Sequence, residues 1–333
     1  VNPTTGTVVS GYSPPGHRVL KYSDVLPSVG AVYAFTPRIS AFGSYSKGLS
    51  VPSTDNLYNA FYFPAGTSEA QPKPETTNSF DGGLRYRSSK IQAQIAGWYT
   101  QFNDRSASAF DPDLNLTVFR NLGRVNKYGI DGSVAYSPTP MLTAYAFGSW
   151  NRSKIQDNIQ TGALPAGSSC DNVDPTVPNN TRLCAFTAGK RESGQPGYMY
   201  GTSLNAKLGL VDLGVTAKRT GTRFVFDNNE SVYTGDIATR TQVFSAKAPA
   251  YWLVNLDARV NMGHFDRKLD KTYLQFNVYN LFDQFYVGGF GGGLSQSTST
   301  RTAAGVTIPT YGAPPFVQIG APRTFSATLN VGF

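Results

Sequence analysis

The sequence predicts an all-β fold, a transmembrane antiparallel β-barrel. Three observations predict it: few charged residues, long segments in which apolar and polar side chains alternate, and connections that alternate between short and long. Charged residues make up 15% of the chain, against about 25% in a typical soluble protein. A soluble β-sandwich would show the same alternation, so the connections must decide between the two folds.

Composition favours strands over helices. Glycine, tyrosine and phenylalanine are abundant, at 34, 19 and 21 residues, and this bias suits strands and turns. No apolar run approaches the ~20 residues of a membrane-spanning helix, so a membrane crossing requires a closed barrel. The net charge of +8 is dispersed with no basic run, so nucleic-acid binding is not expected.

Segments with a two-residue period, bounded by turn residues, indicate about eleven strands. Several are long enough for a tilted membrane crossing of ~9–11 residues. The expected spans are 22–35, 38–50, 76–87, 90–106, 117–136, 141–155, 196–208, 210–226, 246–262, 271–287 and 319–333.

The segment WLVNLDARVNM (252–262) shows the alternation clearly. Apolar side chains such as Leu256 fall on one face, and polar side chains such as Asn255 fall on the other. The last stretch, TFSATLNVGF (324–333), alternates in the same way and ends on Phe333, an aromatic residue suited to the membrane interface. We expect one face to contact lipid and the other to line a lumen. The charges expected on the lumen face are Asp131, Lys207, Asp212, Lys218, Asp257 and Arg259.

The connections favour the membrane barrel, because outer-membrane barrels have short turns at one end and long loops at the other. A soluble sandwich has no reason to keep all its long loops at one end. Short turns are expected at 36–38, 88–90, 137–141, 209 and 263–271, and long loops at 51–75, 107–116, 156–195, 227–245 and 288–318.

Four stretches resemble one family, the TonB-dependent outer-membrane receptors. FNVYNLFDQFYVGG (276–289) resembles their near-terminal N-L-F-D-x-x-Y segment, and APRTFSATLNVGF (321–333) resembles their closing strand. YSKGLSVPSTDNLY (45–58) and NLGRVNKYGIDGSVAY (121–136) are similar to two further strand motifs of the family, in the right order.

The resemblance implies a 22-stranded barrel filled by a plug domain, in the bacterial outer membrane. Residues 1–333 are expected to be the C-terminal half of that barrel, about 11 strands, with the plug domain and signal peptide absent from this chain and residues 1–21 in an extracellular loop. The implied partners are the chain's own N-terminal half and plug, the TonB energy-transducing complex, outer-membrane lipid including lipopolysaccharide, and a small-molecule ligand.

The implied function is energised import of a ferric siderophore or similar iron chelate. Iron would enter only as part of the cargo, and no cofactor or resident metal is expected. The alternatives are a passive porin, a non-transporting surface barrel or adhesin, and import of an oligosaccharide, cobalamin or haem by the same family. An enzyme is not expected, because His17 and His264 lie far from a plausible nucleophile.

Arginines beside aromatic residues in the loops are the candidates for binding an anionic chelate, because arginine binds carboxylates bidentately while aromatic faces cover apolar parts. Lipopolysaccharide phosphates are a rival use of the same charges. Arg120 and Arg223 are the first candidates. The full candidate set is Tyr58, Phe61, Tyr62, Phe119, Arg120, Arg223, Phe224, Phe226, Phe290, Arg301 and Tyr311.

Cys170 and Cys184 lie in the 156–195 loop. An even pair of cysteines in an oxidising compartment predicts a disulfide. Metal binding is the rival interpretation, although neither histidine of the chain is nearby.

Overall fold

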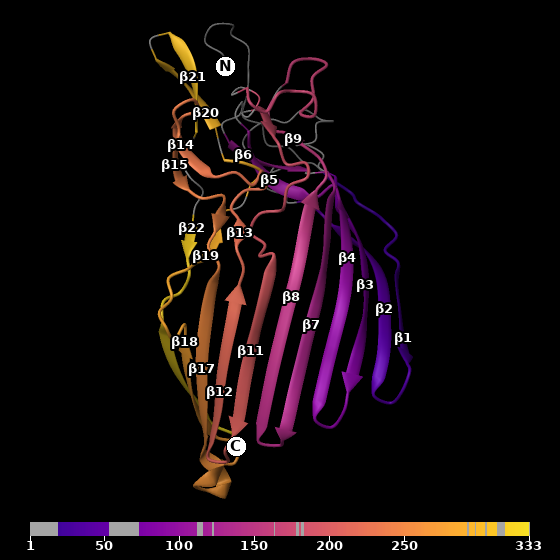
Figure 1. The fold of residues 1–333 in the computed structure, drawn as a ribbon, viewed down its shortest axis with the longest axis vertical. Helices are drawn as coiled ribbons and strands as arrows, with labels where there is room; N and C mark the ends of the chain where they lie inside the picture. The colour runs from indigo at the N-terminus through magenta and orange to yellow at the C-terminus, as the bar shows by residue number, and fades with distance from the viewer. Residues whose placement is uncertain are drawn as a thin grey trace.

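An antiparallel sheet of eleven strands forms the body of the molecule in the computed structural model (Figure 1). The structure describes residues 19–52, 73–111, 116–121, 123–162, 164–177, 180, 183–291, 293–296, 298–303, 305–311 and 317–332. In sheet order the strands are β1 (Ser28–Ala34), β2 (Ile39–Ser50), β3 (Glu75–Arg87), β4 (Ile91–Asn103), β7 (Val125–Thr139), β8 (Leu142–Ile155), β11 (Tyr198–Lys207), β12 (Val211–Thr220), β17 (Tyr251–Asn261), β18 (Tyr273–Tyr279) and β23 (Thr324–Asn330). Sheet order follows chain order and every neighbouring pair is antiparallel, so the predicted all-β fold is confirmed.

The sheet is curved and open. Its edge strands are β1 and β23, which do not pair with each other. No helix within the described residues is both long and apolar enough to cross a membrane.

Several predicted strand spans are too long. The spans 22–35 and 246–262 start too early, because β1 begins at Ser28 and β17 at Tyr251. The span 117–136 is divided, because β6 (Leu116–Asn121) pairs with β5 (Ser106–Asp111) in a separate hairpin before β7 begins. The span 210–226 ends at Thr220, and 271–287 ends at Tyr279. The last strand, predicted over 319–333, is the shorter β23, and Phe333 lies outside the described residues.

The connections divide between the two ends of the sheet, as predicted. The turns β1–β2, β3–β4, β7–β8 and β11–β12 lie at the lower end in Figure 1, together with the β17–β18 turn that carries the 3₁₀ helices η2 (Met262–His264) and η3 (Arg267–Leu269). The described parts of the longer connections all lie at the upper end. We call these the turn end and the loop end.

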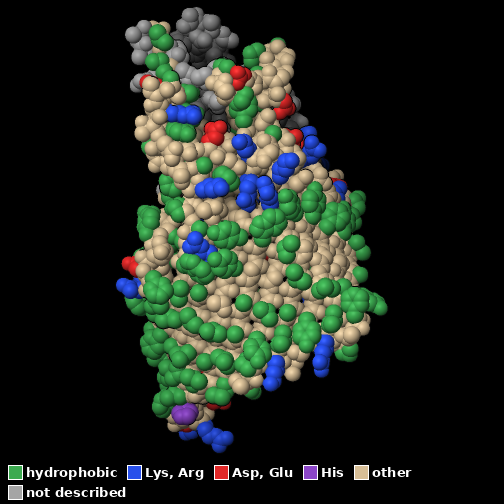
Figure 2. All heavy atoms as spheres, viewed as in Figure 1, with side chains coloured by type: hydrophobic (Ala, Val, Ile, Leu, Met, Phe, Trp, Pro, Cys, Tyr) green, Lys and Arg blue, Asp and Glu red, His purple; other side chains and the backbone are tan. Residues whose placement is uncertain are grey.

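The strand register fixes which side chains share a face. Leu256 pairs with Val215 on one side and Val278 on the other, and Val215 pairs with Leu204. These residues face outward, where apolar side chains cover much of the surface (Figure 2). Leu204 leaves 46% of its surface exposed, as expected of a side chain that would contact lipid.

Glycines on the inner, concave face are covered by aromatic rings from the neighbouring strand. The pairs are Phe42 with Gly83, Trp98 with Gly129, and Phe147 with Gly201. A Cβ placed on Gly129 would lie 2.7 Å from Cζ2 of Trp98 and 2.6 Å from the carbonyl oxygen of Trp150. Each ring therefore occupies the space above a residue without a side chain, as in aromatic rescue of strand glycines.

The long connections form small sheets of their own, which were not predicted from the sequence. A four-stranded sheet joins β14 (Val232–Asp236) and β15 (Thr241–Phe244) with β20 (Thr298–Ala303) and β21 (Val306–Tyr311). The two-stranded pairs are β9 (Ile159–Gln160) with β10 (Cys184–Ala185), β13 (Arg223–Phe224) with β16 (Lys247–Ala248), and β19 (Val287–Phe290) with β22 (Val317–Ile319).

The buried apolar residues gather at the loop end. Val225, Phe226 and Val232 form one cluster, against which Phe244 and Phe290 pack. Ile159, Ala185 and Leu294 form a second. The described loops are therefore packed structures that stand on the rim of the sheet.

Candidate functional site

A buried ion network joins the sheet to the long connection between β8 and β11. Arg105 Nη1 donates to both carboxylate oxygens of Glu75 on β3 at 3.0 Å, and its Nε donates to Glu192 Oε1 at 3.1 Å. Lys127 on β7 places Nζ 2.6 Å from Glu192 Oε2. The ring of Phe102 lies between the two cations, 4.9 Å from Arg105 Cζ and 4.8 Å from Lys127 Nζ.

A second contact joins this connection to the loop after β13. Asp227 is buried, and its Oδ1 accepts the backbone N–H of Ser193 at 2.6 Å. Asn229 accepts the N–H of Arg191 at 2.9 Å and donates to its carbonyl at 2.7 Å. Burial raises the pKa of Asp227 to about 6, and the nearby charge of Glu192 adds to the rise.

Arg223 and Phe226, both predicted ligand residues, belong to the framework of the loops. Arg223 is 6% exposed, and its guanidinium donates to the carbonyls of Val287 and Gly288, the latter at 3.0 Å. Phe226 is 5% exposed within the apolar cluster that Phe290 borders. The guanidinium of Arg223 therefore holds β19 in place and is not open to a ligand in this arrangement.

An exposed arginine beside aromatic rings occurs elsewhere in the loops. The guanidinium carbon of Arg240 lies 4.1 Å from the ring centre of Tyr233 and 5.0 Å from that of Tyr311, and its Nη1 donates to the Tyr311 hydroxyl. Burial raises the pKa of Tyr311 above its usual value. We call Tyr233, Arg240 and Tyr311 the Arg240 cluster.

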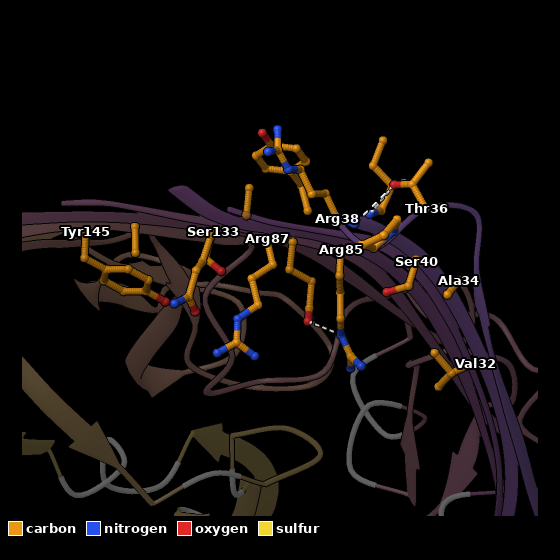
Figure 3. A pocket seen from close by; sticks show the side chains of 16 residues that line it. Val32, Ala34, Thr36, Arg38, Ser40, Arg85, Arg87, Ser133 and Tyr145 are labelled. Atoms are coloured by element: carbon orange, nitrogen blue, oxygen red, sulfur yellow. Dashed lines mark hydrogen bonds between the residues drawn. The ribbon is translucent and has the colours of Figure 1, made fainter. Parts of the chain in front are cut away.

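The inner face bears an open groove of about 650 Å³ near the turn end (Figure 3). Arg85, Arg87, Ser133 and Tyr145 point into it, while Arg38 points away (Figure 3). Arg85 donates from Nε to Gln94 Oε1 at 2.8 Å. The groove is thus a cationic and hydrogen-bonding part of the inner wall, suited to acidic groups of whatever fills the lumen.

The remaining predicted ligand residues are spread over several loops. Phe224 is partly buried beside Lys247, whose Nζ lies 4.7 Å from its ring centre. Phe119 and Arg120 lie on β6, opposite Ser108 and Ala107 of β5, and Arg301 lies on β20 opposite Ile308. Tyr58, Phe61 and Tyr62 lie outside the described residues.

The Arg240 cluster and the Arg105 network were not predicted from the sequence. Arg240 has no adjacent aromatic residue in the sequence, and its ring partners lie 7 and 71 positions away. The signal that could have identified it is the alternation of YTGD and TQVF on either side, which forms the β14–β15 hairpin. For Arg105, the partners at 75 and 192 carry no local signal.

Cys170 and Cys184 form a disulfide with their Cα atoms 5.6 Å apart, the pairing expected from the sequence. Both residues are buried. Within the ranges that the structure describes, no group of three or more His, Cys, Asp or Glu side chains is arranged to hold a metal ion.

Comparison with known proteins identifies one family. The family model described as TonB dependent receptor-like, beta-barrel matches residues 2–281. Three of the solved structures that resemble the chain are a ferric yersiniabactin uptake receptor from Yersinia pestis (15% identity, TM-score 0.57), a ferric citrate transporter (16%, 0.59) and a copper transporter (17%, 0.58).

Each of these structures shares the fold over 92% of this chain. This chain in turn covers 37% of the yersiniabactin receptor, 39% of the copper transporter and 38% of the citrate transporter. The chain therefore spans about two fifths of the length of the proteins it resembles.

Proposed function

The chain belongs to the TonB-dependent receptor family, and from that premise we propose that residues 1–333 form the C-terminal half of the barrel of a receptor that imports a ferric siderophore or similar metal chelate. Proteins of this family are receptors and transporters of the outer membrane of Gram-negative bacteria. The observation that carries the proposal is the family match together with an eleven-stranded sheet whose long loops stand at one end.

In this proposal the loop end is extracellular and the turn end is periplasmic. The open edges β1 and β23 pair with the N-terminal half of the same barrel, because unpaired strand edges are not tolerated in lipid. The inner face receives the plug, and the groove at Arg85 and Arg87 faces acidic or carbonyl groups of it. TonB acts through that plug.

The Arg240 cluster is the part of the described loops best suited to an anionic chelate. The arginine is exposed, and two tyrosines restrain its side chain, so less rotamer freedom is lost when it binds a carboxylate. Arg301, on β20 of the same four-stranded sheet, and Arg120, on β6 of another hairpin, are further candidates. Arg223 supports these loops through its contacts with the carbonyls of β19.

The test is uptake by cells that carry the full receptor and no other route for the chelate. Growth on ferric siderophores as sole iron source should depend on the receptor and on an intact TonB system. Uptake that persists without TonB would favour the passive porin. If the receptor supports uptake of an oligosaccharide, cobalamin or copper but of no iron chelate, that compound would replace the ferric siderophore as the proposed ligand.

The residue-level test compares Arg240→Ala with Arg267→Ala, a matched exposed arginine in the opposite, short-turn end. Loss of a charge-assisted contact should weaken chelate binding by about tenfold or more in the first variant and leave the second unchanged. Equal affinity of both variants and the wild type for all anionic chelates would remove the Arg240 cluster from the ligand site.

A further inference from the structure

The β17–β18 turn differs from the other connections at the turn end. Those are tight turns, the longest of them over 35–38, whereas residues 262–272 separate β17 from β18 and contain η2 and η3. This segment projects beyond the other turns (Figure 1). We call residues 262–272 the knob.

The knob is a folded structure and not a slack loop. The backbone N–H of Leu269 donates to the carbonyl of Asp266 at 2.8 Å. The Asp266 side chain accepts the backbone N–H of Lys268 at 2.9 Å and so caps η3. A Cβ placed on Gly263 would lie 2.6 Å from the Cα of Asp270, so the two halves of the knob touch. The side chains of the knob are therefore presented on a fixed backbone.

The knob exposes an aromatic ring. Phe265 leaves 68% of its surface exposed, and Leu269, four positions on, leaves 38%. The ring of His264 meets that of Phe265 edge-on, with the ring centres 6.1 Å apart. Arg267 lies between the two apolar residues in sequence and is itself exposed. An accessible aromatic ring close to an arginine is the combination that contributes most to binding surfaces.

The turn end presents an excess of positive charge. The knob has three basic and two acidic side chains, and the other turns at this end add basic side chains only. No salt bridge within the described residues involves Arg267 or Lys268. Basic side chains and a histidine gather at the tip (Figure 2). The surface therefore favours an anionic partner. The charged residues of these turns are Arg38, Lys90, Asp266, Arg267, Lys268, Asp270 and Lys271.

We propose that the knob docks on peptidoglycan, the glycan–peptide polymer of the periplasmic cell wall. This rests on the proposed membrane orientation, which places the turn end in the periplasm. Sugar rings have apolar faces that pack against an aromatic ring such as Phe265. The stem peptides of the polymer carry carboxylates, which Arg267 and Lys268 bind through charge-assisted hydrogen bonds. The knob thus meets a polymer that repeats both groups at short intervals.

A repeating polymer fits so small a surface better than a folded protein does. One ring and two unpaired cations fall well short of the surface that a stable protein–protein contact buries, about 1,200 Å² or more. A weak site suffices when the partner repeats it. Many receptors in one membrane face one continuous polymer, so their weak contacts reinforce one another.

The experiment measures co-sedimentation of the full receptor in detergent with purified peptidoglycan sacculi at about 0.15 M salt. The knob variant carries Phe265→Ser, Arg267→Gln and Lys268→Gln. The control variant removes one exposed apolar side chain and two cations from the other turns at the same end, through Met141→Ser, Arg38→Gln and Lys90→Gln. Further arms use sacculi with amidated carboxylates, polyglutamate or soluble wall fragments as competitors, and phosphatidylglycerol vesicles.

We expect the knob variant to bind sacculi about tenfold or more weakly than the wild type. The control variant should bind like the wild type, because charges more than about 8 Å from the contact are screened at this salt. Both variants should keep the heat-modifiable migration of a folded barrel. Amidated sacculi should bind the wild type as weakly as native sacculi bind the knob variant. This arm needs no variant, so it tests the proposal even if a variant fails to fold.

Unchanged binding in the knob variant would overturn the proposal, and so would an equal loss in both variants, which would indicate diffuse electrostatic attraction. Competition by polyglutamate as strong as that by wall fragments would replace the polymer with an acidic protein. Tighter knob-dependent binding to the vesicles than to sacculi would replace it with a membrane. A receptor that binds sacculi through the knob yet imports no chelate would refute the proposed function alone, and import without knob-dependent binding would refute this proposal alone.

Discussion

Replacing Asp227 with asparagine should stabilise the loop end at neutral pH. Two cations and two carboxylates of the neighbouring network, Arg105 and Lys127 with Glu75 and Glu192, balance each other. An ionised Asp227 adds a buried negative charge to this balanced set. Burial therefore raises its pKa from 3.8 to about 6.

The sign of the pH dependence follows from proton binding. Between pH 3.8 and about 6 the folded loop holds a proton on Asp227 that the unfolded chain has released. The stabilisation is fully present below 3.8 and is lost as pH rises through 6. A shift of about two units corresponds to about 3 kcal/mol in total, of which about 2 kcal/mol is lost between pH 4.5 and 7.5.

Hydrogen exchange of peptides spanning 186–197 in the full receptor measures this loss. Comparing the variant with the wild type at the same pH cancels the pH dependence of chemical exchange. The quantity compared is the opening equilibrium of this segment in Asp227→Asn divided by that in the wild type. This ratio should be about 30-fold smaller at pH 7.5 than at pH 4.5. Asp266→Asn in the distant β17–β18 turn is the control. The same ratio at both pH values in the Asp227 variant would refute the reasoning.

The other predictions concern the sheet and the loops. Leu256→Arg should cost on the order of 2–4 kcal/mol in a barrel-folding assay, and Asn255→Arg on the inner face far less; equal cost would contradict the register. Asn280→Ala should destabilise the receptor to urea by about 2 kcal/mol or more, because a buried side-chain amide with three hydrogen bonds is lost from a residue at positive φ. Asn280→Gly should recover only the part of the lost stability that comes from the positive φ of the backbone. Full recovery of stability would show that the hydrogen bonds of the amide contribute nothing. Reducing the disulfide between Cys170 and Cys184 should destabilise its loop by about 3 kcal/mol, seen as faster proteolysis there; unchanged proteolysis would refute this. Residues 1–333 expressed alone should not migrate as a heat-modifiable barrel; if they do, the open edges are satisfied in another way.

The two-residue period predicted the eleven strands of the sheet because each strand has one apolar and one polar face. Strand ends were less accurate where the backbone turns at a single residue. Gly123 at φ +73° precedes β7, and Asn280 at φ +52° follows β18, although both lie inside segments that continue to alternate. A side chain that accepts and donates locally, such as Asn280, outweighs that periodicity.

The loop sheets and the candidate site could not be predicted in the same way. β14 pairs with β21 across more than 70 positions, from Gly235 to Tyr311, and short strands with distant partners give no periodic signal. Arg223 beside Phe224 suggested a ligand contact, yet the partners of its guanidinium are backbone carbonyls. Because every residue has a backbone carbonyl, the residue types in the sequence do not show that an arginine will bind one.

Where an aromatic ring covers an inner-face glycine, the free width inside the barrel at that height depends on both residues of the pair. Any side chain at Gly129 would meet the Trp98 ring and the Trp150 carbonyl, so the indole would have to swing inward and narrow the passage. Replacing Trp98 with a small residue would have the opposite effect and widen it at the same height. A substitution at either position should therefore be compensated by one at the other, and the two should vary together among related barrels that keep the same calibre.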